Sequence, residues 1–179
     1  MPKSLMHYNK NLIYDNYMYV KFEDLPSSSR VWIYQSDREF SNQEINFITE
    51  KAIEFIDQWT KHGFNLKGSF TIKYNQFLVL AVDEGFNNVS GCSIDSSVRF
   101  VKELEISLEV DMMNKMNISY KDGNHINILT MSDFKEFTKS NKITSETIVF
   151  NNMISTKQEL NVHWEVPLIN SWHKRFLPS

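Results

Sequence analysis

In the first two thirds of the chain, the pattern of hydrophobic and polar residues is typical of strands in some stretches and of amphipathic helices in others. Val31–Tyr34 and Phe77–Val82 are continuous apolar runs, typical of strands that are covered on both faces. Between them, residues 70–74 alternate between apolar and polar side chains, which predicts a strand with one face in water. The pattern therefore predicts two central strands and one edge strand.

The intervening stretches have the period of amphipathic helices. Ser41–Glu44 has the sequence of a capping box, in which the serine and glutamate side chains satisfy free backbone N–H groups. Apolar residues then recur on one helical face over residues 45–59, and a second such stripe covers residues 94–108. Because Ile118 and Tyr120 begin another strand, the predicted order is strand, helix, strand, strand, helix, strand.

This order predicts an α+β fold with a ferredoxin-like βαββαβ core, a sandwich of two layers. In that fold the first and third strands are central, and here those two are uniformly apolar. We expect one α+β domain over residues 19–179. Residues 1–18 are rich in Asn and Tyr without either period, which predicts a loose N-terminal tail.

The rest of the chain predicts additions that extend the sheet and cover one side of it. Asp122-Gly123 is a strong signal for a tight hairpin, and Ser132 is placed to cap a short helix. Residues 147–150 form an apolar run typical of a strand. Thr156–Glu159 repeats the pattern of a capping box. We therefore expect a C-terminal hairpin, helix and strand beyond the core.

Composition excludes several classes of function. The net charge of -3 provides no overall basic field for nucleic acid or for acidic membranes, and no apolar run is long enough to span a bilayer. A single cysteine excludes an intrachain disulfide and a multi-cysteine metal site, and the five histidines form no local metal-binding pair. We expect a soluble cytoplasmic protein that uses no metal and no cofactor.

The stretch Ser90–Ser97 is the first candidate site, because it contains the only cysteine at the predicted start of a helix. Backbone N–H groups at such a start attract anions and stabilise a thiolate. Cys92 is therefore a candidate nucleophile, with His163 or His173 as its base, although the charge of Asp95 in the same turn opposes a thiolate. In the alternative interpretation, Cys92 is a buried packing residue and its polar neighbours are helix caps. The candidate ligand-binding residues here are Gly91, Ser93 and Ser96.

The second candidate site is Trp172–Arg175, the most cationic aromatic cluster in the chain. The guanidinium of Arg175 can hold a phosphate or carboxylate in two hydrogen bonds. Trp172 provides an aromatic face on which a ligand can stack. Alternatively, the segment is a C-terminal strap whose aromatic residues pack on the core. We expect both candidate sites to meet in space, with Cys92, His173 and Asp95 as the catalytic set.

Four phrases of the sequence are similar to those of a small uncharacterised bacterial family whose members often carry the label "ABC transporter ATPase". They are Ser29–Gln35, Gly91–Val98, Val149–Asn152 and Ser171–Phe176. The resemblance covers most of the chain after the tail and implies no established activity.

The label itself conflicts with the residues. A phosphate-binding loop requires a lysine after its second glycine, and in the nearest match, Gly63–Ser69, that lysine is missing. The same segment leaves a predicted helix and enters a strand, the reverse of the order that the motif needs. We therefore exclude an ABC-type ATPase. We expect a small-ligand-binding or protein-interaction module, a dimer of identical chains that takes a small anionic ligand. The alternative is an enzyme in which Cys92 performs acyl or thiol chemistry.

Overall fold

The computed structural model describes residues 19–61, 67–85 and 91–178, without the side chains of residues 60, 61 and 91–93. The predicted tail, residues 1–18, lies outside this description. The elements in chain order are η2 (Phe22–Asp24), β1 (Arg30–Gln35), α1 (Asn42–Lys61), β2 (Lys67–Lys73), β3 (Phe77–Asp83), α2 (Gly91–Leu108), β4 (Asn117–Asp122), β5 (His125–Thr130), α3 (Met131–Lys139), β6 (Ile148–Phe150), α4 (Lys157–Val162), β7 (Glu165–Pro167), η3 (Leu168–Asn170) and η4 (Trp172–Phe176).

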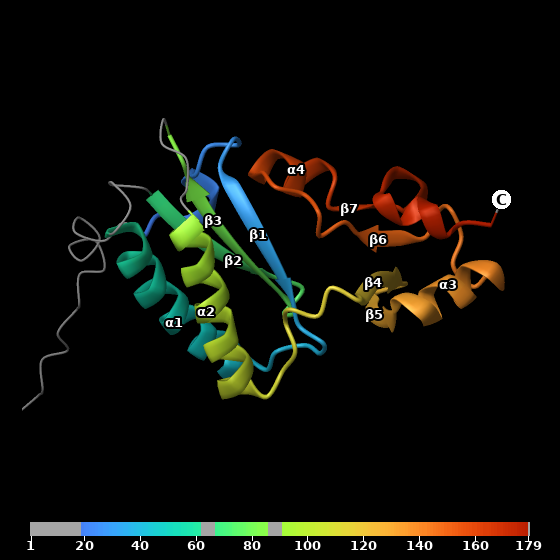
Figure 1. The fold of residues 1–179 in the computed structure, drawn as a ribbon, viewed down its shortest axis with the longest axis horizontal. Coiled ribbons are helices and arrows are strands. Elements are labelled where there is room, and N and C mark those ends of the chain that lie inside the picture. Colours follow the sequence, from blue (N-terminus) through green and yellow to red (C-terminus); the bar gives the residue numbers. More distant parts are fainter. Residues whose placement is uncertain (1–18, 62–66, 86–90, 179) are drawn as a thin grey trace, which may run out of the picture.

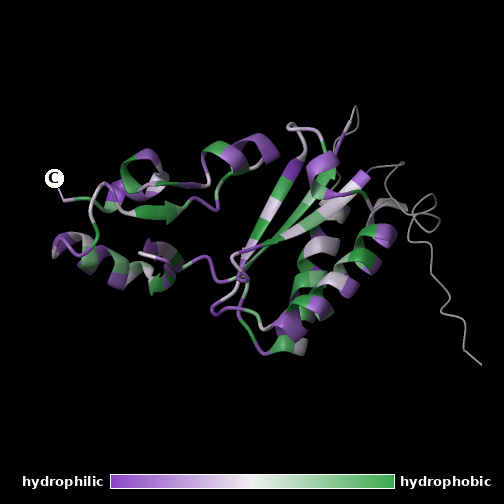
Figure 2. Ribbon diagram, turned by 180° about the vertical axis from the view of Figure 1, so that it is seen from behind, coloured by the Kyte–Doolittle hydropathy of each residue, from purple (hydrophilic) through white to green (hydrophobic). Residues whose placement is uncertain are grey.

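The fold is mixed α+β, with two antiparallel sheets. The first sheet has the strand order β1-β3-β2, and the second has the order β5-β4-β6-β7. The first lobe, residues 19–112, contains the first sheet with α1 and α2 on one face. The second lobe, residues 113–178, contains the second sheet, and both views show the lobes side by side (Figures 1 and 2).

Strand β3 is buried along most of its length because both faces of the first sheet are covered. Leu78, Leu80 and Val82 pack with the apolar stripes of α1 and α2. The alternate residues Phe77, Val79 and Ala81 pack on the opposite face, in a cluster to which the second lobe contributes Phe150, Ile154, Leu160 and Trp164. The continuous apolar run in the sequence is therefore explained by two cores, one of which both lobes share.

The position of β4 differs from the expected one. A ferredoxin-like core needs its fourth strand beside β1, but β4 pairs with β5 and β6 in the second sheet. The chain beside β1 is instead Asn152–Thr156. The Val31 N–H donates to the Ser155 carbonyl (2.9 Å), Arg30 and Thr156 form an antiparallel bridge, and the Asn152 side chain donates to Gln35 Oε1 (2.9 Å).

The local sequence signals are largely confirmed. Ser41 and Glu44 form both hydrogen bonds of the predicted capping box, as do Thr156 and Glu159 at the start of α4. The hairpin at Asp122-Gly123 is present, with Gly123 at a positive φ of 60°. The expected cap of α3 is wrong, because Thr130 rather than Ser132 accepts the backbone N–H of Asp133.

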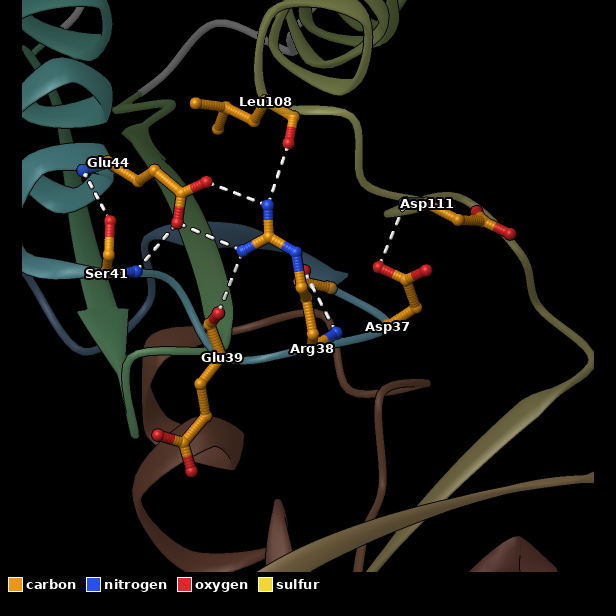
Figure 3. Close-up of polar contacts among 8 residues, drawn as sticks. Asp37, Arg38, Glu39, Ser41, Glu44, Leu108 and Asp111 are labelled. Carbon is orange, nitrogen blue, oxygen red and sulfur yellow. Dashed lines mark hydrogen bonds and ion pairs between the residues drawn. The ribbon is translucent and has the colours of Figure 1, made fainter.

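Arg38 joins the start of α1 to the end of α2 (Figure 3). Its guanidinium donates to both carboxylate oxygens of Glu44 (3.0 and 2.8 Å) and to the Leu108 carbonyl (2.8 Å). The Arg38 hydrogen bonds, with those from Ser41, lower the pKa of Glu44 to about 2. The last carbonyls of a helix attract cations, so this arginine stabilises two helix ends at once.

We expect Arg38→Gln to lower the free energy of unfolding by about 1 kcal/mol, since the ion pair faces solvent. The contribution of Glu44 is present above its unfolded pKa and is lost as the pH falls toward 2. Urea unfolding at pH 7 and pH 3 measures both effects. The exposed Arg99 on α2 provides the control, and an Arg38→Gln loss equal to that of Arg99→Gln would contradict the proposed role.

Candidate functional site

The structure describes only part of the predicted cysteine site. Helix α2 begins at Gly91, so the stretch does start a helix as expected. The side chains of Gly91, Cys92 and Ser93 lie outside the described residues. Asp95 is exposed and Ser96 is half-buried.

Ser97, in the same turn, has a structural role. Its hydroxyl is fully buried, donates to the Ile94 carbonyl (2.7 Å) and lies 3.2 Å from the Tyr34 hydroxyl of β1. Burial raises the pKa of Tyr34, and the hydrogen bond with Ser97 lowers it by a smaller amount. This pair fixes the first turns of α2 on the sheet and leaves no free hydroxyl at position 97.

His173 lies in the core of the second lobe rather than at a surface. It is 2% exposed, and its ring packs on Trp172 (4.1 Å between centroids) and faces Phe134 (5.8 Å). Nδ1 shares a hydrogen bond with the Ser171 hydroxyl (2.8 Å). Burial lowers the pKa of His173 to about 4. The imidazole is therefore neutral at physiological pH.

The structure does not bring the two predicted sites together. Helix α2 lies in the helical layer of the first lobe, whereas Trp172–Phe176 lies in the second lobe close to the C-terminus (Figures 1 and 2). Arg175 lies over the rings of Trp172 and Phe176, and Asp95 has no ion pair with it. The described residues therefore assemble no catalytic set from Asp95 and His173.

A groove of about 700 Å³ does lie at the second predicted segment. It is formed where the end of α4, β7 and the two C-terminal 3-10 helices meet, with a contribution from the turn after β6. Its lining residues are Asn151, Val162, His163, Val166, Ile169, Asn170, Ser171, Trp172 and Lys174. Of the predicted ligand-binding residues, Trp172 lines the groove, whereas Arg175 does not.

The groove has a cationic and an apolar part. Among the described residues that line it, Lys174 and His163 are the only ionisable ones, and none is a carboxylate. Both side chains are exposed, and in the described part of the chain neither forms a hydrogen bond or ion pair. Val162 and Ile169 are also exposed, at 58% and 45%. A ligand with an anionic group and an apolar body is complementary to this surface, because the anionic group matches Lys174 and the apolar body matches Val162 and Ile169.

The sequence pattern indicates this segment but not the residues that lie beside it in the groove. Trp172 and Lys174 belong to the predicted cationic cluster, whereas Asn151, His163 and Asn170 come from separate turns. His163, which the sequence offers as a possible base for Cys92, is the residue that ends α4 and lies in this groove instead. Nothing in the spacing of these residues indicates that they face one groove.

Comparisons with family models, curated proteins and solved structures found no match to this chain. None of the helices in the described part of the chain is both long and apolar enough to cross a membrane. Over the same residues, no group of three or more His, Cys, Asp or Glu side chains is arranged to hold a metal ion.

Proposed function

We propose that this protein is a binding module for a small organic anion, and that the C-terminal groove is its binding site. The observation that carries the proposal is that Lys174 and His163, two exposed side chains without a partner among the described residues, lie in a groove to which those residues contribute no carboxylate. A cation without a protein partner is available to a phosphate or carboxylate, and a charge-assisted hydrogen bond is stronger than a neutral one.

The other lining residues favour an organic ligand over a simple ion. Trp172 adds an apolar lining surface to the groove, and its half-buried ring is held in place by stacking on His173. The exposed side chains of Val162 and Ile169 would lose contact with water when an apolar body lies on them. Asn151 and Asn170 supply uncharged donors and acceptors. The ligand class is therefore a small carboxylate or phosphate with an apolar or planar body.

A thermal-shift screen of small carboxylates and phosphates tests the proposal, followed by calorimetry on the compounds that raise the melting temperature. Because Lys174 supplies the permanent charge, Lys174→Gln should weaken binding about tenfold. Lys115→Gln is the matched control, since Lys115 is an exposed lysine in the turn before β4. It should bind with the affinity of the unmodified protein.

Two outcomes would overturn the proposal. One is a screen in which no anion raises the melting temperature. The other is a ligand that binds Lys174→Gln and Lys115→Gln equally well, because it would then bind elsewhere. The screen contains phosphates and carboxylates with the same apolar parts. A comparison of the melting temperatures within each such pair then shows which anionic group the groove prefers.

We further infer that the first lobe is a modified ferredoxin-like unit. Its β1-α1-β2-β3-α2 order and its β1-β3-β2 sheet match the first five elements of that fold. Residues 152–156 would then occupy the place of the fourth strand, antiparallel to β1. The similarity to the bacterial family remains a prediction from its four phrases.

A further inference from the structure

Strand β5 differs from the other edges of the two sheets. Residues 152–156 lie along β1, and Val20 donates its N–H to Gly68 at the outer edge of β2. Strand β7 is only three residues long and ends in Pro167. Such short, covered or proline-containing edges are protected against further pairing. Strand β5 has six residues, HINILT, and contains no Lys, no Pro and no acidic residue.

The ladder shows which backbone groups of β5 point outward. The Met131 N–H donates to the Met116 carbonyl, and the pairing continues in register to Asp122 and His125. Antiparallel pairs alternate between hydrogen-bonded and non-hydrogen-bonded. Leu129, Asn127 and His125 are therefore the residues bonded to β4, and the N–H and C=O groups of Ile126 and Ile128 point away from it.

These outward groups have no partner in the described chain. Among the described residues, no backbone or side-chain hydrogen bond outside the ladder involves Ile126 or Ile128. Both views place β5 at the lower margin of the second lobe, with no other element of the described residues beyond it (Figures 1 and 2). The side chains of residues 126–129 are only partly buried. The edge is thus open to a strand of another chain.

We propose that two copies of this protein associate through β5, as an antiparallel pair of edge strands that joins the two second sheets. A two-fold axis at Asn127 sets Ile126 of one copy opposite Ile128 of the other. Each such pair exchanges two backbone hydrogen bonds, so all four outward donors and their acceptors are satisfied. The strand contains no Lys, Arg, Asp or Glu, so two antiparallel copies place no such like charges opposite each other.

The same register gives a covalent test. On the axis, Asn127 faces its own copy in a non-hydrogen-bonded pair, in which the Cα atoms are about 4.5 Å apart. That separation lies within the range of a disulfide. In a chain with Cys92→Ala, which removes the native thiol, Asn127→Cys should therefore form a disulfide-linked dimer under mild oxidation.

Asn124→Cys is the matched control, because Asn124 lies in the turn of the same hairpin. The two copies of residue 124 would be separated by six residues along the paired strands, or about 20 Å, which is too far for a disulfide. This variant should stay monomeric on a non-reducing gel. Cross-linking of both variants to the same extent would reflect random collision and would overturn the proposed register.

Sedimentation equilibrium of the full chain provides the second measurement. The mean mass should rise toward that of a dimer with concentration, and Ile128→Pro should abolish this rise. Proline removes an outward N–H and leaves the ladder to β4 intact, whereas Ile128→Val keeps the N–H and should dimerise normally. Circular dichroism checks that both variants are folded, and Ile128→Lys replaces the proline variant if that one unfolds.

The proposal fails if the unmodified chain stays a monomer at all concentrations. It also fails if a dimer persists in the folded Ile128→Pro or Ile128→Lys variant, because another surface would then hold the copies together. A monomer that instead binds an extended peptide at β5 would identify a different occupant for this edge and would overturn self-association.

Discussion

Replacement of Trp164 by alanine should lower the free energy of unfolding by about 3–5 kcal/mol, the usual cost of removing a large buried aromatic ring. The Trp164 side chain is 3% exposed and lies at the junction of the two lobes. Its ring centroid is 5.1 Å from that of Phe77 on β3 and 4.9 Å from that of Phe150 on β6. Truncation therefore leaves a cavity in the core that both lobes share.

The indole N–H contributes separately, because it donates to the Asn152 side chain (2.9 Å), which in turn donates to Gln35 at the end of β1. Trp164→Phe keeps much of the apolar contact but removes this donor, so we expect a loss of about 1–2 kcal/mol. Urea unfolding with a shared m value measures both variants. Equal losses for phenylalanine and alanine would contradict the assignment of most of the stability to ring packing.

The second large effect is a pH dependence that originates at His173. In the unfolded chain this imidazole titrates near pH 6.5, whereas in the folded protein its pKa is about 4. The unfolded state therefore binds the proton first, and stability that is fully present above pH 6.5 is lost as the pH falls toward 4. We expect a loss of about 2 kcal/mol between pH 7.5 and pH 5.

Two measurements check this dependence. Unfolding free energies between pH 7.5 and pH 5 should fall in the unmodified protein and stay nearly constant in His173→Gln. His125→Gln, which replaces an exposed histidine of β5, should keep the full dependence. If His173→Gln does not fold, an NMR titration of the unmodified protein decides the matter, and a folded pKa near 6.5 would contradict the prediction.

The local structure of this protein follows closely from its sequence. The apolar run of β3 predicts burial on both faces, and the structure confirms it with separate cores on either side. The capping boxes at Ser41 and Thr156 predict helix starts correctly because their hydrogen bonds join residues only three positions apart. Signals of this kind do not depend on distant parts of the chain.

The arrangement of the elements was harder to predict. The alternation at Ile118 and Tyr120 indicates a strand but does not identify its neighbour, and the ferredoxin-like order places this strand beside β1. Residues 152–156 have the Asn, Ser and Thr content of a turn, and their place beside β1 follows from tertiary contacts. At the candidate site, His173 is buried whereas the next residue, Lys174, is exposed. The sequence of the cluster does not show which of the two side chains faces solvent, and the three-dimensional structure does.

The segment beside β1 also has a consequence for how the chain folds. The hydrogen bond between Asn152 and Gln35 spans 117 positions of sequence. Contacts of such separation form slowly, because a long loop must close before they contribute. During synthesis, the outer face of β3 would stay exposed until residues 150–164 emerge. We therefore expect the shared core to assemble late, and the exposed face of the nascent first lobe to be prone to aggregation until the second lobe covers it.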